Sequence, residues 1–515
     1  MVRILRPTVA ASGRTDQIDM AHPATRWAFS CEKGFVMRVM SRCAVLPFAI
    51  WSGAALANPA TPEGADALIA LFQTYLGSTA GVVSVVPLGE TYGVKLDFAP
   101  LAAKLPEVTA SISPWEFTLT DNGDGTWAMA QDQILQLDLK VPGQLDLSLH
   151  IGNFASDGVF DTALQTFTTN SASFSDLSLT ETMVDPTFGD THVTYQIARG
   201  QYESTGVAGA EGGVDLTSTY AMSGLSESFT LPAFGEGEAA TEIALHAESY
   251  TAEGQMLGLR PEALARLLAF FVANPSEAAI IAQQADLKSI LTDGLPLFET
   301  LESTGTITAI SADTPLGTVT LDEMGIDVAA NGLTENGMVS EGFRLKGLAL
   351  PEGLVPDWAV GLVPSEASIG FTLADFNLAA PAALLLASVD FGAEIPPETQ
   401  AALLEALLPE GAVTFVLSPG GVTAPLYALT YEGVLSYTPE AMPQGSATVT
   451  ATGIPAVLTA LESAPPDVAM QIAPMLAMAQ GLAEPGENND LVWNIEMTPE
   501  GAVLINGTDL MGGGQ

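Results

Sequence analysis

The strongest candidate for chemistry is a short polar stretch, residues 118–130, which reads TLTDNGDGTWAMA. Its residues Asp121, Asn122 and Asp124 carry the oxygen ligands that Ca²⁺ prefers. An EF-hand loop needs acids at positions 1, 3 and 5 and a glycine at position 6, but position 3 counted from Asp121 is Gly123. Asn-Gly and Asp-Gly are dipeptides that favour tight hairpin turns. The sequence therefore predicts a turn between two strands and no metal site.

Other catalytic patterns are weak. His150, His192 and His246 each fall on the polar side of an alternating segment and lack the clustered partners of a metal or acid–base site. The chain has no G-x-S-x-G, S-x-x-K, Walker or G-x-G-x-x-G pattern in a suitable context. A hydrolase with a carboxylate pair stays open as an alternative, because 60 acidic residues allow many pairs. The sequence predicts a non-enzymatic protein with no catalytic residue and no cofactor.

The N-terminal region has the features of an export signal. From Met37 to Ala57 a short basic stretch is followed by an apolar stretch and an A-x-A site, which predicts a secretory signal cleaved between Ala57 and Asn58. Residues 1–36 are interpreted as an upstream extension, and the start codon, Met1, Met37 or Met40, is left open. We expect a protein exported to the periplasm of a Gram-negative cell.

The charge of the chain limits its partners. It has 515 residues with 16 Lys and Arg against 60 Asp and Glu, a formal net charge of −44. Such an acidic surface repels nucleic acid and anionic membrane surfaces. No apolar run after the signal reaches the roughly 18 residues of a transmembrane helix. Both cysteines, Cys31 and Cys43, lie in the segment expected to be removed, so the core alone must hold the fold.

Alternating hydrophobicity predicts strands through most of residues 58–257, which also begin with a helix. The clearest hairpin lies at residues 135–151, LQLDLKVPGQLDLSLHI, where apolar residues alternate on both sides of Pro142-Gly143. One apolar and one polar side is typical of an antiparallel sheet that is wet on one face.

Residues 258–515 add helical blocks, at 260–301, 396–411 and 454–482. In the first of these, Leu264, Leu267, Leu268 and Phe271 share one helical stripe. Three four-residue turns follow the blocks and suggest a weak repeat of helix, strand, turn and strand: TPLG at 314–317, SPGG at 418–421 and TPEG at 498–501. The alternative to a repeat is that the three turns are unrelated and share residue types only because type I turns favour them.

Weak candidates for an apolar binding site are Trp358, in a proline-broken apolar connection, and three methionines of the last helical block, Met470, Met475 and Met478. Methionine makes an adaptable apolar wall, and filling of the core is the commoner use of all four side chains. The sequence does not identify a ligand.

Three stretches, FTLTDNGDGTWAM (117–129), LQLDLKVPGQLDLSLHI (135–151) and MTPEGAVLINGTDL (497–510), resemble an alphaproteobacterial exported family of unknown function, domain-of-unknown-function family 2125. The resemblance implies a periplasmic location and a distant likeness to AsmA-like envelope proteins, whose β-rich grooves are associated with lipid handling. The cleavable signal departs from the membrane anchor of those proteins. The resemblance supplies no catalytic residue.

These features predict an α+β protein of elongated, twisted antiparallel sheets, with helical hairpins packed on the apolar face. The expected organisation is an extension and signal at 1–57, a helix and β-rich region at 58–257 and a helical-hairpin and β-hairpin region at 258–515. The favoured function is binding of a lipid or other apolar ligand in a β-groove. A scaffold or protein-interaction domain with a filled core is the alternative.

Overall fold

The computed structural model describes residues 59–104, 108–184, 190–210, 212–231, 241–439, 441–487 and 490–509. These residues belong to one compact unit. The extension, the signal segment and the expected cleavage site at Ala57 and Asn58 lie outside them, so the export signal stays a prediction. No helix among the described residues is long and apolar enough to cross a bilayer.

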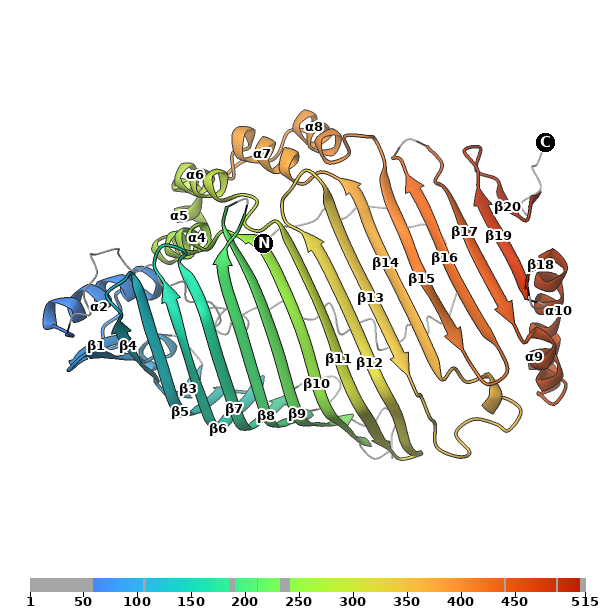
Figure 1. Ribbon diagram of the computed structural model, residues 1–515, viewed down its shortest axis with the longest axis horizontal. Helices are drawn as coiled ribbons and strands as arrows, with labels where there is room; N and C mark the ends of the chain where they lie inside the picture. Colours follow the sequence, from blue (N-terminus) through green and yellow to red (C-terminus); the bar gives the residue numbers. More distant parts are fainter. Residues whose placement is uncertain are drawn as a thin grey trace. The chain divides into compact units, whose positions relative to one another are not determined.

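The strands form a single 21-stranded sheet in which every named pairing is antiparallel (Figure 1). The first strands are β1 (Val83–Leu88), β2 (Thr91–Leu96), β3 (Thr109–Ile112), β4 (Trp115–Asp121), β5 (Thr126–Val141), β6 (Leu145–Asp161), β7 (Thr166–Met183), β8 (Thr191–Ala208), β9 (Val214–Leu231) and β10 (Thr241–Leu259). They are followed by β11 (Thr300–Thr314), β12 (Gly317–Asn331), β13 (Gly337–Lys346), β14 (Glu366–Phe376), β15 (Val413–Thr423), β16 (Ala428–Tyr437), β17 (Gln444–Thr452), β18 (Glu484–Pro485), β19 (Leu491–Met497), β20 (Val503–Ile505) and β21 (Thr508–Asp509). From β4 to β17 each strand pairs with the next one along the chain.

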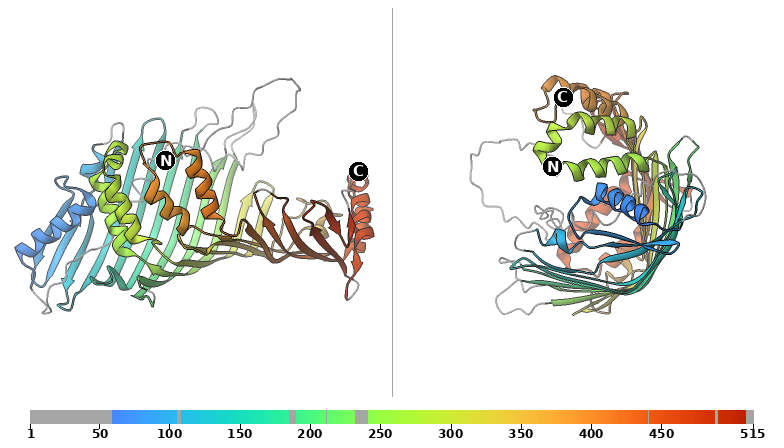
Figure 2. Two further views of the ribbon diagram at one scale, coloured as in Figure 1. Left: turned by 90° about the horizontal axis from the view of Figure 1, so that it is seen from above. Right: turned by 90° about the vertical axis from the view of Figure 1, so that its left-hand side faces the viewer.

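One helix precedes the first strand, and the others are inserted between strands (Figure 2). They are α2 (Pro62–Leu76), α3 (Ala99–Ala102), α4 (Pro261–Ala273), α5 (Glu277–Ala282), α6 (Gln284–Gly294), α7 (Ala379–Ser388), α8 (Pro397–Leu407), α9 (Ile454–Leu461), α10 (Pro466–Leu482) and the short 3₁₀ turn η2 (Val360–Leu362). Contacts join α2 to α4, α4 to α6, α6 to α7 and α7 to α8. Because β10 and β14 run in the same direction, the helices that follow them leave the sheet at the same strand ends, where Figure 1 shows them.

The expected α+β class with several helix-covered sheets is wrong. Strands make up 52% of the described residues and helices 23%, and the strands belong to one large antiparallel sheet. The helical blocks occur where the sequence predicts them. Most of these helices lie in the connections between strands, at the strand ends. The sheet is also continuous across residue 258, since β10 pairs with β9 on one side and with β11 on the other.

The hydrophobic core is concentrated at the N-terminal end of the sheet. Helix α2 packs on β1, and its Phe72 meets Phe117 of β4 edge to face with ring centroids 6.1 Å apart. Thr61 caps this helix by accepting a hydrogen bond from the Gly64 amide, and Pro62 occupies a favourable first position. The covered strand residues are fully or almost fully buried, among them Val85, Val94, Leu96, Phe117 and Leu119.

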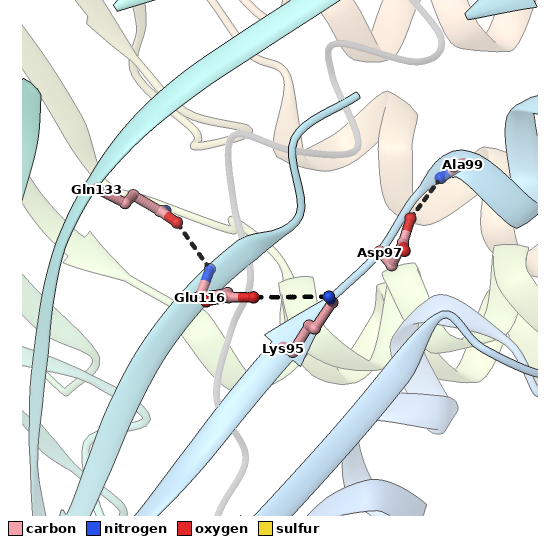
Figure 3. Close-up of polar contacts among 5 residues, drawn as sticks. All are labelled: Lys95, Asp97, Ala99, Glu116 and Gln133. Carbon is pink, nitrogen blue, oxygen red and sulfur yellow. Dashed lines mark hydrogen bonds and ion pairs between the residues drawn. The ribbon is translucent and has the colours of Figure 1, made fainter. Parts of the chain in front are cut away.

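Strand β5 changes neighbours along its length, and Figure 3 shows the point of exchange. It pairs with β4 near its start and with β3 near its end. Between the two, the Gln133 side-chain carbonyl accepts a hydrogen bond of 3.0 Å from the Glu116 amide, replacing a missing ladder bond. Nearby, Asp97 caps the turn into α3 by accepting from the Ala99 amide, and Lys95 forms an exposed ion pair with Glu116 that contributes little stability.

The polar stretch at 118–130 is the predicted turn between β4 and β5. Gly123 and Gly125 have φ values of 77° and 90°, which glycine adopts without strain. The Asp121 carboxylate accepts from the Gly123 amide, and the Asp124 carboxylate accepts from the amide and hydroxyl of Thr126. The two hydrogen bonds from Thr126 lower the pKa of Asp124, and the bond from the hydroxyl has the larger effect. Both carboxylates therefore accept hydrogen bonds from within the turn and stabilise it.

The other hairpin and turn predictions have mixed outcomes. The hairpin at 135–151 is confirmed, with Val141 opposite Leu145, and turns are confirmed at 314–317 and 498–501. The SPGG stretch is not a turn: it lies inside β15, where the register of β15 shifts against both neighbours. The proposed repeat therefore loses one of its three turns. In α4 the predicted stripe is also wrong, because Ala263, Ala265 and Phe270 are buried and Phe271 is exposed.

Candidate apolar binding face

Directly paired residues of an antiparallel sheet point to the same side, so the register assigns side chains to faces. We call the side that carries Phe343 and Phe371 the apolar face and the side that carries Arg344 and Thr372 the polar face. On the apolar face, the register aligns residues of β12, β13, β14 and β15, namely Met324, Ile326, Val328, Ala330, Val339, Glu341, Phe343, Leu345, Ala367, Ile369, Phe371, Leu373, Phe415 and Leu417. Glu341 is the only charged residue in this set.

The polar face of the same strands has a different chemistry. The register places on it Glu323, Asp327, Ser340, Arg344, Lys346, Ser368, Thr372 and Thr414. Arg344 and Asp327 form an ion pair there, and Thr372 donates a hydrogen bond of 2.9 Å to Ser340. Charge and hydroxyl groups thus gather on one side of the sheet, and hydrocarbon on the other.

In the described part of the chain, the hydrocarbon side of these strands stays accessible to solvent. Its large side chains are between 36% and 48% exposed: Ile326, Val328, Val339, Phe343, Ile369, Phe371, Leu373 and Phe415. We call these eight residues the exposed patch. The rings of Phe371 and Phe415 stack with centroids 6.1 Å apart and an angle of 19° between planes. An apolar surface of this kind, interrupted only by Glu341 between Val328 and Phe371, is uncommon on soluble monomers and is typical of sites that bind partners or ligands.

The apolar face continues on either side of the patch. Toward the N-terminus, the pairing Ser303–Val328 carries it through β11, and further pairings carry it to the residues under α2. Toward the C-terminus it reaches Trp493 of β19, whose indole N–H donates a hydrogen bond of 2.8 Å to the Ala479 carbonyl of α10. Helices α2 and α10 therefore pack on this face near its two ends, and the patch lies between them.

A hollow of about 350 Å³ opens on the apolar face beside the patch. Its apolar lining includes Phe167, Leu216, Met256 and Leu301, and its polar lining is uncharged. A second, shallower hollow of about 650 Å³ lies over β12 to β17 and is lined by charged and hydroxyl side chains, including Arg344, Lys346 and Glu366.

Farther along the sheet, Tyr195 of β8 lies opposite Glu227 of β9. Burial raises the pKa of Tyr195 to about 12, and a hydrogen bond to Glu227 and the charges of Glu227 and Glu181 add to the shift. The folded protein holds the Tyr195 proton more tightly than the unfolded chain, in which the pKa of tyrosine is about 10. The resulting contribution to stability is complete below pH 10 and is lost as the pH rises to about 12.

We therefore expect an alkaline absorbance titration to include a step near pH 12 that belongs to Tyr195. Tyr195→Phe removes this step, and Glu227→Gln moves it toward lower pH. A variant lacking Tyr195 whose titration curve matches the wild type at the alkaline end would contradict the assignment.

The residues proposed from the sequence are placed elsewhere. Trp358 lies half-buried in the connection between β13 and β14. Met470, Met475 and Met478 are on α10 and are 71%, 59% and 65% exposed, so they do not fill the core. None of these four residues lines the hollow on the apolar face. Sequence reasoning does not single out the odd-numbered residues Ile369, Phe371 and Leu373 of β14, although their alternation with small or hydroxyl-bearing residues is visible in the sequence.

Metal and histidine sites have no support in the described part of the chain. No group of three or more His, Cys, Asp or Glu residues is arranged there to hold a metal ion. His150, His192 and His246 are all exposed. His192 shares a hydrogen bond of 3.0 Å with the Thr182 hydroxyl, and His246 lies 3.9 Å from Asp313.

Comparison with known proteins gives no family. No family model and no curated protein matches the chain. Two solved structures align over 70% of this chain and 62% of their own: a mutant of the ferric enterobactin receptor PfeA from Pseudomonas aeruginosa, at 11% identity and a TM-score of 0.16, and the siderophore receptor PirA from Acinetobacter baumannii, at 8% and 0.15. This chain thus spans about three fifths of the length of those receptors. Similarity this low supports no conclusion about fold or function.

Proposed function

We propose that this protein is a non-enzymatic envelope protein that binds the acyl chain of a lipid on the apolar face of its sheet. The observation that carries the proposal is the exposed patch: eight aliphatic and aromatic side chains on four adjacent strands, with Glu341 as the only charge aligned among them. Removing such side chains from water is favourable by about 25 cal/mol per Å².

The dimensions of the patch suit a hydrocarbon chain. Its four strands span three spacings of about 4.8 Å, or roughly 14 Å across the sheet. The hydrocarbon core of a bilayer is about 30 Å thick, so one leaflet contributes roughly 15 Å. An acyl chain laid across β12 to β15 would cover the patch along most of its length.

The charge of the chain favours a lipid over a second copy of the protein. Two copies at a formal charge of −44 each repel one another, and this repulsion opposes pairing of their apolar faces. A hydrocarbon chain has no such penalty. The predicted export signal and the resemblance to periplasmic envelope proteins agree with a compartment where membrane lipids are the available apolar ligands.

Photo-crosslinking tests where a chain binds. A fatty alcohol with a diazirine at the chain end is mixed with the full-length protein in detergent-free buffer, irradiated, and the labelled peptides are mapped. We expect labels within residues 317–376 and 413–423, and competition by the unmodified alcohol. Labels that avoid these strands, or that resist competition, would contradict the proposal. Displacement of the probe by a co-purified protein would support the interaction-domain alternative instead.

A further inference from the structure

The hollow beside the exposed patch is a furrow that crosses the strands. Its floor is a ladder of directly paired small residues, Asn170, Ser204, Ser218, Gly254 and Ser303, one from each strand from β7 to β11. The next paired residue is Val328, which belongs to the exposed patch. The furrow and the patch therefore form one track on the apolar face, which is interrupted on β13 by Glu341, the partner of Val328.

Larger side chains form the walls of this furrow. On one side lie Leu216, Met256 and Leu301, each two residues along its strand from the floor, and Phe167, which is three residues from Asn170. On the other side lies Tyr202. Gly254 leaves the middle of the floor open, since a Cβ there would approach the Ser218 hydroxyl to 3.1 Å. The floor covers four strand spacings, or roughly 19 Å, so the track extends well beyond the length of one acyl chain.

The floor is polar but uncharged. No Lys, Arg, Asp or Glu is among the residues that line the hollow. The Asn170 side-chain oxygen is buried beside Gly158 of β6, where a Cβ would come within 3.2 Å of it, and it has no hydrogen-bond partner among the described residues. The same lack of a partner holds for the oxygen of Gln131 on the same face. A buried carbonyl oxygen without a donor costs about 1–3 kcal/mol, so a ligand that donates a hydrogen bond from the furrow favours rotation of the Asn170 amide toward it.

We propose that the furrow holds the head of an uncharged, hydroxyl-bearing lipid, of the monoacylglycerol type, while its acyl chain lies on the exposed patch. This inference rests on the proposed function. The hydroxyl of the head donates to the Asn170 oxygen, and the serine hydroxyls of the floor supply further partners. An anionic head is excluded because the furrow offers it no cation and the chain around it is strongly acidic.

The contribution of the head to affinity can be measured apart from that of the acyl chain with three lipids that share one acyl chain. They are a monoacylglycerol, the fatty-acid methyl ester and the lysophosphatidylglycerol. Each displaces a fluorescent acyl probe from the full-length, delipidated protein. We expect the monoacylglycerol to bind at least tenfold more tightly than the ester, and the lysophosphatidylglycerol to bind more weakly than both. Asn170→Leu keeps the volume of the side chain and removes its acceptor. It should abolish the tenfold preference by weakening the binding of the monoacylglycerol more than that of the ester.

Thr169→Val is the matched control, since Thr169 is the neighbour of Asn170 on the polar side of β7 and is exposed. It should preserve the preference. Equal binding of the monoacylglycerol and the ester would overturn the head site and leave the proposed function standing, as would tightest binding of the anionic lipid. Equal loss of all three lipids in Asn170→Leu would also overturn it, by showing a structural role. Failure of every lipid and of the acyl probe to bind the wild type would overturn the proposed function itself.

Discussion

Ile369→Asp lowers the affinity of the protein for an acyl chain by about tenfold or more, whereas Val434→Asp leaves it unchanged. Ile369 belongs to the exposed patch, where it pairs with Phe343 of β13 and stands two residues from Phe371 on its own strand. A carboxylate there must lose water when the chain binds, and no cation is among the residues aligned with the patch to compensate. A tenfold loss corresponds to about 1.4 kcal/mol, well within the cost of desolvating a charge.

The two variants are closely matched. Ile369 and Val434 are 48% and 45% exposed, both lie within strands, and both substitutions add one negative charge. The two residues lie on opposite faces of the sheet. Val434 pairs with Val416, which in turn pairs with Thr372 on the polar face. Titration of a fluorescent acyl probe measures both affinities. Equal effects of the two substitutions would show that surface charge, and not the apolar face, governs binding.

Phe72→Ala destabilises the protein by about 3–5 kcal/mol, the usual cost of deleting a buried aromatic ring. Phe72 is 2% exposed and joins α2 to the apolar face through Phe117. Its loss leaves a cavity between helix and sheet in the densest part of the core. Urea denaturation followed by circular dichroism gives the free energy of unfolding.

Phe271→Ala is the control for this substitution. Phe271 lies on α4 and is 43% exposed, so its removal should change the free energy of unfolding by less than about 1 kcal/mol. If both variants lose the same stability, α2 does not anchor the end of the sheet in the way described.

The local structure was largely readable from the sequence. Alternation in residues 135–151 gave the hairpin of β5 and β6, and Asn-Gly with Asp-Gly gave the turn before it. The helical blocks were recognisable because their prolines stand at first helical positions, as in α4 and α8. These signals depend on neighbours within a few residues, which a single sequence displays directly.

The site was not readable, because it depends on register between distant strands. Ser204, Ser218 and Ser303 are unremarkable in the sequence, and they form a floor only when β8 to β11 align. The SPGG stretch has good turn composition, but pairing on both sides holds it within β15. The helical blocks also suggested a cover for the apolar face, and nothing local indicated that the patch on β12 to β15 would remain open.

Native mass spectrometry of the full-length protein, purified from its own compartment without detergent, tests the central claim most directly. Organic extraction of the same sample identifies any bound species. We predict one or a few lipid molecules per chain, retained by Val434→Asp and lost from Ile369→Asp. A clean mass without lipid for the wild type, together with no uptake of added monoacylglycerol, would contradict the account of the apolar face as a lipid-binding surface.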